Sequence, residues 1–376
     1  MSVSGFRSLK SFNMKILPGL NMLVGPNGSG KTNIIMFFEF LSSIMQMSLS
    51  DAVSASGGAM EVFSRSRKSE TFEPFSASVS GNFRSVRRDS HFVRYRYSFE
   101  VMLSEDRDQI FFRSQELKIS RSKDKKIRTK WDLHFKSTAD PENINNVKVQ
   151  IITADLRKIS SPRYTDSDFS ARPRTEKITA IENVIARFSD GENSIVMLPY
   201  GLLDEVRELP RDFIGGEAFN IMPAAARLPD DGATKPGVRK DGSGLAATLY
   251  ALKKFDQNTG IRRRSRPYYG PAPYRRNPYD GNRDFRPKRR SFSQIKELAN
   301  LVNSEIHDLD IQLDHRDNKI KVHTTMATTD GELSLPFSFL SDGTVKWIAL
   351  VTAIFTYRSI FAIEEPENFI HPLMQQ

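Results

Sequence analysis

The sequence predicts an α/β protein, and three patterns carry that prediction. An apolar run at Asn21–Val24 precedes a glycine-containing loop and a stretch with helical periodicity, Lys31–Met47, which is typical of strand, loop and helix. Residues 91–103 alternate bulky and polar side chains, as a half-buried strand does. Near the end of the chain, an apolar helix at Gly343–Tyr357 precedes a short buried strand at Ile360–Ile363.

Weaker patterns complete the expected fold. Together with 91–103, three further alternating runs indicate an antiparallel sheet, and they lie at 110–119, 129–135 and 147–152. Helices are expected at 178–187, 202–209, 244–254 and 293–304, a hairpin at 311–323 and a small polar loop at 50–59.

Composition limits the class of protein. The chain has 376 residues, 39% hydrophobic and 27% charged, and no run of 18 apolar residues, so we expect a globular cytoplasmic protein without a membrane span. Cysteine is absent, which excludes disulfides and thiolate sites. The net charge of +10 favours a polyanionic partner, nucleic acid before anionic lipid.

The strongest motif is Gly25-Pro-Asn27-Gly28-Ser29-Gly30-Lys31-Thr32, a complete G-x-x-x-x-G-K-T between the first predicted strand and helix. Its glycines let successive N–H groups approach phosphate oxygens, and the helix N-terminus adds a positive end. We expect Lys31 to reach the β- and γ-phosphates of ATP and the Thr32 hydroxyl to bind Mg²⁺. Asn33, which follows directly, is a further candidate for nucleotide binding.

Paired acids follow the last predicted strand. In Ile363-Glu364-Glu365-Pro366-Glu367, Glu364 is expected to hold Mg²⁺, and Glu365 to orient and deprotonate the attacking water. Lys31 and Glu365 are therefore the predicted catalytic residues.

A third motif, Leu340-Ser341-Asp342-Gly343-Thr344, directly precedes the apolar helix. Ser341 or Asp342 can cap that helix. The same geometry forms an anion site, because a helix N-terminus with a hydroxyl and a glycine N–H attracts phosphate. Since the glycine-rich loop already surrounds the γ-phosphate, this second site is useful only towards the nucleotide of another subunit.

Along the chain the glycine-rich loop comes first, Leu340–Thr344 second and the paired acids last. Motifs in that order resemble those of the ABC-type ATPases of the RecF, SMC-like and OLD group, including bacterial ATPases associated with Septu and retron phage defence. Leu340–Thr344 stands in for the signature L-S-G-G-Q. Gly5–Lys10 resembles the N-terminal strand of the group, which places Arg7 near the nucleotide. Gly242–Leu249 is similar to a helix start of these ATPases, and Glu365–Pro372 to their D-loop.

The resemblance implies an ABC-type P-loop head with a mixed central sheet, an antiparallel β lobe and a helical, basic insertion. We expect residues 1–50 and 293–376 to form the nucleotide-binding core, 51–160 the β lobe, and 161–292 the insertion with a mobile loop at 255–292. It also implies a homodimer or higher even-numbered oligomer, closed when Ser341 and Gly343 of one subunit cover the Mg-ATP of the other.

Two features of the group are harder to place. The group carries a switch histidine on a strand after the D-loop. His371 is too near the acids for that role, so we expect the strand outside this sequence, which ends at Gln376. The Q-loop glutamine has three candidates, Gln46, Gln115 and Gln150.

Residues 261–290 hold ten arginines and one lysine against two aspartates, with tyrosines among prolines. This mixture favours a surface loop that contacts single-stranded DNA or RNA, since arginine binds phosphate and tyrosine stacks on bases; a solvated loop without a partner is the alternative. The candidate contacts are Arg262, Arg263, Arg264, Arg266, Tyr268, Arg275, Arg276, Lys288, Arg289 and Arg290.

Two functions remain open at this stage. One is a slow ATPase that acts as a switch on nucleic acid or on a separately encoded effector nuclease, in anti-phage defence or DNA repair. The other is a scaffold that binds ATP and positions a partner without turnover. A transporter ATPase is disfavoured by the signature and by the basic loop. No acid cluster predicts a nuclease site in this chain.

Overall fold

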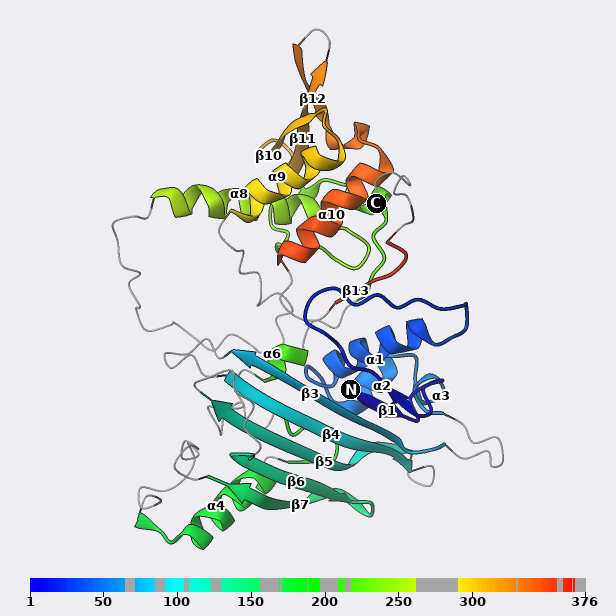
Figure 1. The fold of residues 1–376 in the computed structure, drawn as a ribbon, viewed down its shortest axis with the longest axis vertical. Helices are drawn as coiled ribbons and strands as arrows, with labels where there is room; N and C mark the ends of the chain where they lie inside the picture. The colour runs from blue at the N-terminus through cyan, green and yellow to red at the C-terminus, as the bar shows by residue number, and fades with distance from the viewer. Residues whose placement is uncertain are drawn as a thin grey trace. The chain divides into compact units, whose positions relative to one another are not determined.

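The computed structural model describes residues 1–64, 72–84, 92–104, 108–122, 130–155, 169, 171–187, 189–196, 209–213, 218–261, 290–328, 331–356, 361–366 and 368. The chain divides into two compact units, unit 1 at Met1–Gly216 and unit 2 at Glu217–Gln376. Both combine helices with strands (Figure 1), so the predicted α/β class is confirmed.

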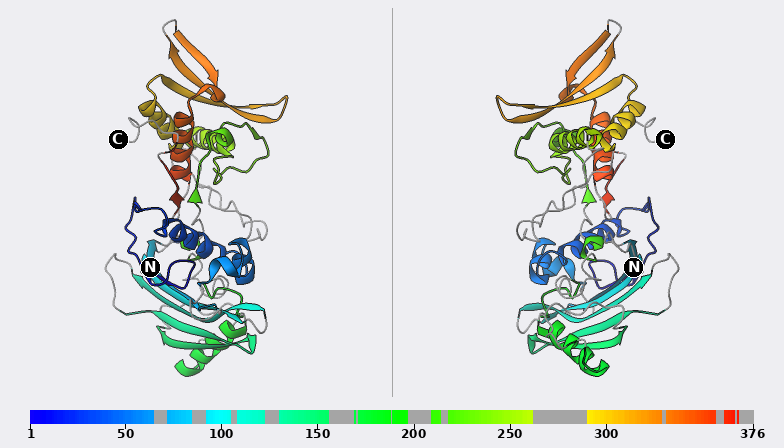
Figure 2. Two further views of the ribbon diagram at one scale, coloured as in Figure 1. Left: turned by 90° about the vertical axis from the view of Figure 1, so that its right-hand side faces the viewer. Right: turned by 90° about the vertical axis from the view of Figure 1, so that its left-hand side faces the viewer.

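Unit 1 is built on a seven-stranded antiparallel sheet, in the order β2-β1-β3-β4-β5-β6-β7. The strands are β1 (Ser2–Ser4), β2 (Phe12–Asn13), β3 (Phe75–Arg84), β4 (Phe92–Ser104), β5 (Gln109–Ser122), β6 (Leu133–Asp140) and β7 (Asn143–Ala154). Figure 2 shows the twist of this sheet from two sides. Its long strands alternate buried and exposed residues, so one face packs against the core and the other stays polar.

The predicted sheet is therefore confirmed, with two differences. The strand β3 lies outside the four predicted runs, and the strand expected at 129–135 begins at Leu133. Both differences follow from pairing, since β3 pairs with β4 over its whole length and β6 pairs with β5 only from Leu133 onwards.

The helices of unit 1 are α1 (Lys31–Ser43), α2 (Leu49–Ala55), α3 (Ala59–Val62), α4 (Arg174–Arg187) and α6 (Pro210–Phe213). An aromatic cluster seats α1 against the sheet. The ring of Phe6 lies 5.5 Å from that of Phe37 in α1 and 5.2 Å from that of Phe75 in β3. All three side chains are fully buried. This packing fixes the helix that follows the glycine-rich loop.

Two local expectations for unit 1 were wrong. The polar loop expected at 50–59 contains α2 and α3, because the Ser48 hydroxyl accepts from the Asp51 N–H (3.1 Å) and caps α2. The strand expected at Asn21–Val24 is irregular, and Met22 and Val24 are 77% and 84% exposed. An apolar run forms a strand only with a hydrogen-bonding neighbour, and no described strand of unit 1 pairs with this run.

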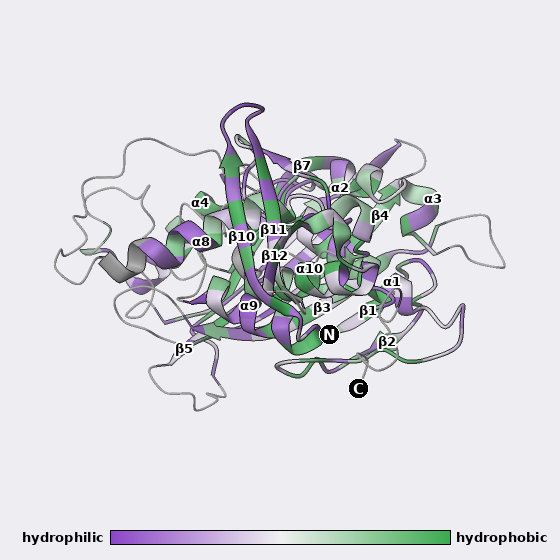
Figure 3. Cartoon of the chain, turned by 90° about the horizontal axis from the view of Figure 1, so that it is seen from above, coloured by the Kyte–Doolittle hydropathy of each residue, from purple (hydrophilic) through white to green (hydrophobic). Residues whose placement is uncertain are grey.

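Unit 2 has a four-stranded sheet in which β10 (Ile306–Asp314), β11 (Lys319–Thr328) and β12 (Gly331–Pro336) follow one another and β9 (Asp230–Asp231) pairs with β11. A second, parallel pair joins β8 (Ala218–Phe219) to β13 (Ala362–Ile363). Figure 3 shows that the β10–β11 hairpin is hydrophilic at its turn. The predicted hairpin is confirmed, and the strand expected at Ile360–Ile363 is described from Phe361, with Ala362–Ile363 in β13.

The helices of unit 2 are α7 (Pro223–Ala226), α8 (Leu245–Ile261), α9 (Ser291–Val302), the 3₁₀ turn η3 (Phe337–Phe339) and α10 (Asp342–Thr356). Three of the predicted helices, at 244–254, 293–304 and 343–357, are thereby confirmed. Most of α10 is buried, and the Trp347 indole N–H donates to the Leu298 carbonyl of α9 (2.9 Å). Of the helix predicted at 202–209, only Leu209 is described.

Within the described ranges, no helix is both long and apolar enough to cross a bilayer.

Candidate functional site

The glycine-rich loop Gly25–Thr32 lies in unit 1 and leads into α1. Gly28 (φ 80°) and Gly30 (φ 92°) adopt the left-handed conformation that glycine tolerates best. Among the described residues no side chain caps the N-terminus of α1, and the first turn of the helix holds no acidic residue. The first N–H groups of α1 therefore remain available to an anion, without a competing carboxylate.

Lys31 is folded back onto this loop. Its Nζ donates to the carbonyl oxygens of Gly25 (2.5 Å) and Pro26 (2.9 Å). Ser29 closes the same turn, since its N–H donates to the Pro26 carbonyl (3.2 Å). The ammonium thus already lies at the loop, and phosphate oxygens can replace the two carbonyls as its acceptors. Thr32 is exposed at the start of the helix.

The turn that contains Arg7 lies next to the loop. Asn33 donates from Nδ2 to the Ser8 hydroxyl (2.6 Å), which joins the turn to α1. Arg7 itself has a left-handed backbone (φ 49°), and its guanidinium binds the Glu61 carboxylate (3.1 Å) and the Ser56 carbonyl (2.8 Å). The structure thus holds the predicted Arg7 at the α2–α3 connection, with its two Nη atoms occupied by protein acceptors.

The predicted acids lie in unit 2, directly after β13. The Glu364 N–H donates to the Phe219 carbonyl of β8 (2.9 Å), which fixes this residue at the strand end. Glu364 is half-buried, whereas Glu365 is exposed and left-handed (φ 44°). Asn368 binds Glu365 twice, from its side chain to Oε2 (2.5 Å) and from its backbone N–H to the carbonyl (3.1 Å).

The signature segment forms the N-terminus of α10. Ser341 is exposed, and its Oγ accepts from the Thr344 N–H (3.2 Å) and shares a hydrogen bond with the Thr344 hydroxyl (2.8 Å). Ser341 is therefore the cap, one of the two residues predicted for it. Asp342 forms an ion pair with Arg227 instead (2.5 Å), and Gly343 is buried.

The glutamine candidates differ in environment. Gln115 is 2% exposed, and it binds the Tyr97 hydroxyl (2.6 Å), the Ile195 N–H (2.9 Å) and the Asn193 carbonyl (3.0 Å). This network occupies Gln115 in the core of unit 1. Gln46 donates to Ser42 within the same chain segment, and Gln150 is exposed on β7.

Most of the predicted nucleic-acid contacts lie outside the described residues, namely Arg262, Arg263, Arg264, Arg266, Tyr268, Arg275, Arg276, Lys288 and Arg289, and so does His371. Arg290 is described and precedes α9 in a left-handed conformation (φ 63°). Its N–H donates to the Asp256 carboxylate of α8 (2.9 Å), which also accepts from the Phe292 N–H (3.0 Å). Asp256 thereby caps α9.

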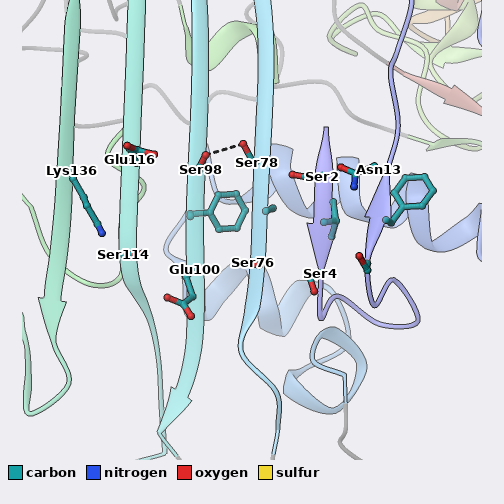
Figure 4. Close-up of a pocket in the computed structure, with 15 residues that line it drawn as sticks. Ser2, Ser4, Asn13, Ser76, Ser78, Ser98, Glu100, Ser114, Glu116 and Lys136 are labelled. Atoms are coloured by element: carbon teal, nitrogen blue, oxygen red, sulfur yellow. Dashed lines mark hydrogen bonds between the residues drawn. The ribbon is translucent and has the colours of Figure 1, made fainter. Parts of the chain in front are cut away.

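A separate depression of about 420 Å³ lies on the polar face of the sheet in unit 1. Figure 4 shows its serine side chains, including the hydrogen bond between Ser98 and Ser78 (2.8 Å), together with Glu100, Glu116 and Lys136. No predicted site residue lines it. Nor do the described residues include a group of three or more His, Asp or Glu side chains arranged to hold a metal.

Three residues that contact the predicted site residues were not predicted from the sequence. Only one of them, Lys346, stands out in the sequence itself. Lys346 is the single lysine of α10, it stands between the apolar residues Val345 and Trp347, and it is fully buried. Ser8 and Arg227 had no such signal, because each acts through a partner distant in sequence, Asn33 and Asp342 respectively.

Comparison with protein families matches both ends of the chain. A model described as "AAA ATPase domain" matches residues 1–195, just over half of the chain, and includes the glycine-rich loop. A second, described as "AAA domain, putative AbiEii toxin, Type IV TA system", matches residues 235–376, which contain the signature and the acids. Searches of curated proteins and of solved structures returned no match.

The motifs, the helix N-terminus after the loop and the two family matches agree, and the chain belongs to the AAA ATPase domain family, in its RecF/SMC-like branch.

Proposed function

We propose that this ATPase binds Mg-ATP at Gly25–Thr32 and hydrolyses it with Glu365 as the general base, while Thr32 and Glu364 hold Mg²⁺. The observation that carries the proposal is the N-terminus of α1, which is uncapped, free of acids and next to the Lys31 ammonium. These donors suit a triphosphate, and the hydroxyl and carboxylate oxygens suit Mg²⁺. Asn27 and Ser29 contribute further backbone and side-chain donors of the loop.

We further propose that two copies associate head-to-tail, so that the signature of one copy contacts the nucleotide of the other. Ser341 supports this, because it is exposed at the N-terminus of α10 and its hydroxyl needs only to rotate to donate to an anion. Hydrolysis then separates the copies, which makes the dimer a switch.

The output of the switch is proposed to be nucleic acid or an effector nuclease, in defence or repair. The basic stretch 261–290 supports a nucleic-acid partner, and a family model named for a toxin–antitoxin system is compatible with defence. Within this scheme, 1–50 and 293–376 supply the nucleotide-binding core, 51–160 the β lobe and 161–292 the insertion.

Phosphate release tests the enzymatic proposal. Glu365→Gln should lower kcat by about 10²- to 10⁴-fold while ATP still binds, because only the base is removed. Lys31→Ala should weaken ATP binding itself. Glu305→Gln, another exposed acid of unit 2, is the matched control and should leave turnover unchanged. Equal rates for wild type and Glu365→Gln would refute the role of the base.

Light scattering of the same variants tests the dimer. Glu365→Gln should accumulate as an ATP-dependent dimer, whereas Lys31→Ala should stay in the resting state. Normal ATP-dependent association of Lys31→Ala would contradict the nucleotide-bridged dimer. Association by the wild type without any phosphate release would instead support the second candidate function, a scaffold that binds ATP without turnover.

The nucleic-acid partner is tested by deleting residues 262–289 and bridging the ends with a short glycine–serine linker, which leaves Arg290 and its partner Asp256 in the chain. If six phosphates are engaged, the log–log slope of affinity against salt should be about −4 to −5, and the deletion should flatten it. Single-stranded DNA and RNA are the probes. Unchanged affinity after the deletion would remove this stretch as the contact.

A further inference from the structure

Lys346 is a fully buried lysine in α10, at 0% exposure. Taking an ammonium out of water is strongly unfavourable unless hydrogen-bond acceptors surround it. An apolar residue of similar volume would fill the same space in this otherwise apolar part of the helix at no such cost. A lysine at this position is therefore not explained by packing alone. The groups that its ammonium binds indicate its role.

Two of its acceptors belong to the acidic segment. Lys346 Nζ donates to the Glu365 carbonyl (2.9 Å) and to the Asn368 carbonyl (2.8 Å). It thus spans the turn that follows β13 and fixes both of its ends. Charge-assisted hydrogen bonds of this kind are about twice as strong as neutral ones.

The backbone held in this way is strained. Glu365 is left-handed at φ 44°, a conformation that is unfavourable for a residue with a side chain. The Glu365 carbonyl accepts from both Lys346 and the Asn368 N–H, and the Asn368 side chain donates to the Glu365 carboxylate. The conformation that orients the carboxylate is therefore maintained by its partners and not by local preference.

The same lysine belongs to the helix that the signature begins. Ser341 caps α10, and Lys346 lies five residues further on, about 7.5 Å along the helix axis. A shift of the α10 N-terminus moves Lys346 with it, because the helix is rigid over this distance, and the carbonyls bound to Lys346 must follow.

We propose that Lys346 is a positioning residue that holds the Glu365 turn in its strained conformation and couples it to the signature end of α10. Contact of the signature with a nucleotide thereby acts on the general base through one buried side chain. This inference rests on the proposed role of Glu365.

The main variant is Lys346→Met, which keeps the length of the side chain and removes its charge and donors; Lys346→Gln restores a neutral donor. Lys346→Met should lower kcat about 10- to 100-fold, in the range caused by a small misplacement of a catalytic group, with ATP affinity within twofold of wild type. Lys346→Gln should recover part of the loss. Combining Lys346→Met with Glu365→Gln should add no further loss, because both act through one carboxylate.

Hydrogen exchange supplies a readout that does not depend on turnover. Lys346→Met should accelerate exchange in residues 361–368 and leave the β10–β11 hairpin unchanged. Lys296→Met is the matched control, since Lys296 is a helical lysine on α9 that is paired with Asp308 (2.8 Å) and partly exposed. Lys296→Met should leave the exchange rates of residues 361–368 and of the β10–β11 hairpin unchanged.

Wild-type turnover by Lys346→Met, or faster exchange throughout unit 2 with parallel loss of ATP binding, would overturn the proposal. Failure of the proposed function looks different: Glu365→Gln would hydrolyse ATP like the wild type, and residues 361–368 would still respond to Lys346→Met.

Discussion

Arg227 and Asp342 form an ion pair (Nη1–Oδ1, 2.5 Å) that fixes the third residue of the signature from the end of α7. The Arg227 Nη2 also donates to the Leu340 carbonyl (2.5 Å), on the other side of Ser341. One guanidinium therefore holds both neighbours of the serine. The signature loop is preset in this conformation by the protein itself, before any nucleotide contacts it.

Removing this clamp should loosen the signature while the glycine-rich loop stays intact. Arg227→Met is expected to lower ATP-dependent dimerisation and kcat about tenfold, with the ATP affinity of the monomer unchanged. Arg239→Met is the control, because Arg239 contacts Ser243 at the exposed end of a turn (3.5 Å). Dimerisation of Arg227→Met at the wild-type ATP concentration would show that the clamp does not matter.

Gly28 gives a test of the phosphate cradle with a close control. An added Cβ at Gly28 would meet no atom within 4 Å, so alanine costs only the strain of the left-handed backbone, about 1 kcal/mol. The methyl group would, however, occupy space that phosphate needs, and ATP affinity should fall at least tenfold. Gly19→Ala has the same left-handed backbone (φ 95°) and open surroundings outside the loop. Calorimetric titration with ATP should separate the two; equal affinities would contradict the cradle.

Gln115 should matter for stability and not for nucleotide binding. Gln115→Leu removes the common partner of Tyr97, Asn193 and Ile195 in the core, which is expected to lower the free energy of unfolding by about 2–4 kcal/mol. Gln150→Leu, on the exposed face of β7, should change it by less than about 0.5 kcal/mol. Chemical denaturation of both variants checks this. If Gln115→Leu were as stable as the wild type but had lost ATP turnover, Gln115 would have to be assigned to the nucleotide site.

The lowered pKa of Asp310 predicts that unit 2 loses part of its stability in acid. The hydrogen bond from Lys253 (2.7 Å) is the main cause that lowers the pKa of Asp310 below 3.8, and Gln312 assists while partial burial opposes it. A lowered folded-state pKa stabilises the folded protein above the unfolded-state pKa, and this contribution disappears as the pH falls through the folded-state pKa.

Asp310→Asn should therefore cost about 0.5 kcal/mol at neutral pH, a value kept small by the exposure of the carboxylate, and should flatten the stability curve below about pH 4. Lys253→Met should remove the same pH-dependent part from the other side of the pair. The measurement is the denaturation midpoint between pH 2 and 7. An unchanged slope in Asp310→Asn would assign the acid sensitivity to other groups.

The sequence by itself determined the features that depend on neighbouring residues. The glycine-rich loop and α1 follow from glycine conformation and helical periodicity, and strands β4, β5 and β7 from alternation. The signature helix was predictable with its cap, since Ser341 needs only the N–H of Thr344, three residues away.

Tertiary structure alone decided the features that depend on distant partners. Asn21–Val24 has the composition of a strand, yet it is not one in unit 1, because strand formation requires a neighbour that composition does not supply. Lys346 is the opposite case: a charged residue that would be expected in solvent is buried, because the carbonyls of Glu365 and Asn368 satisfy it from 19 and 22 residues further along the chain. The periodicity of a sequence indicates which apolar side chains will be buried. A charged side chain can be buried beside them only where the folded chain supplies hydrogen-bond acceptors for it.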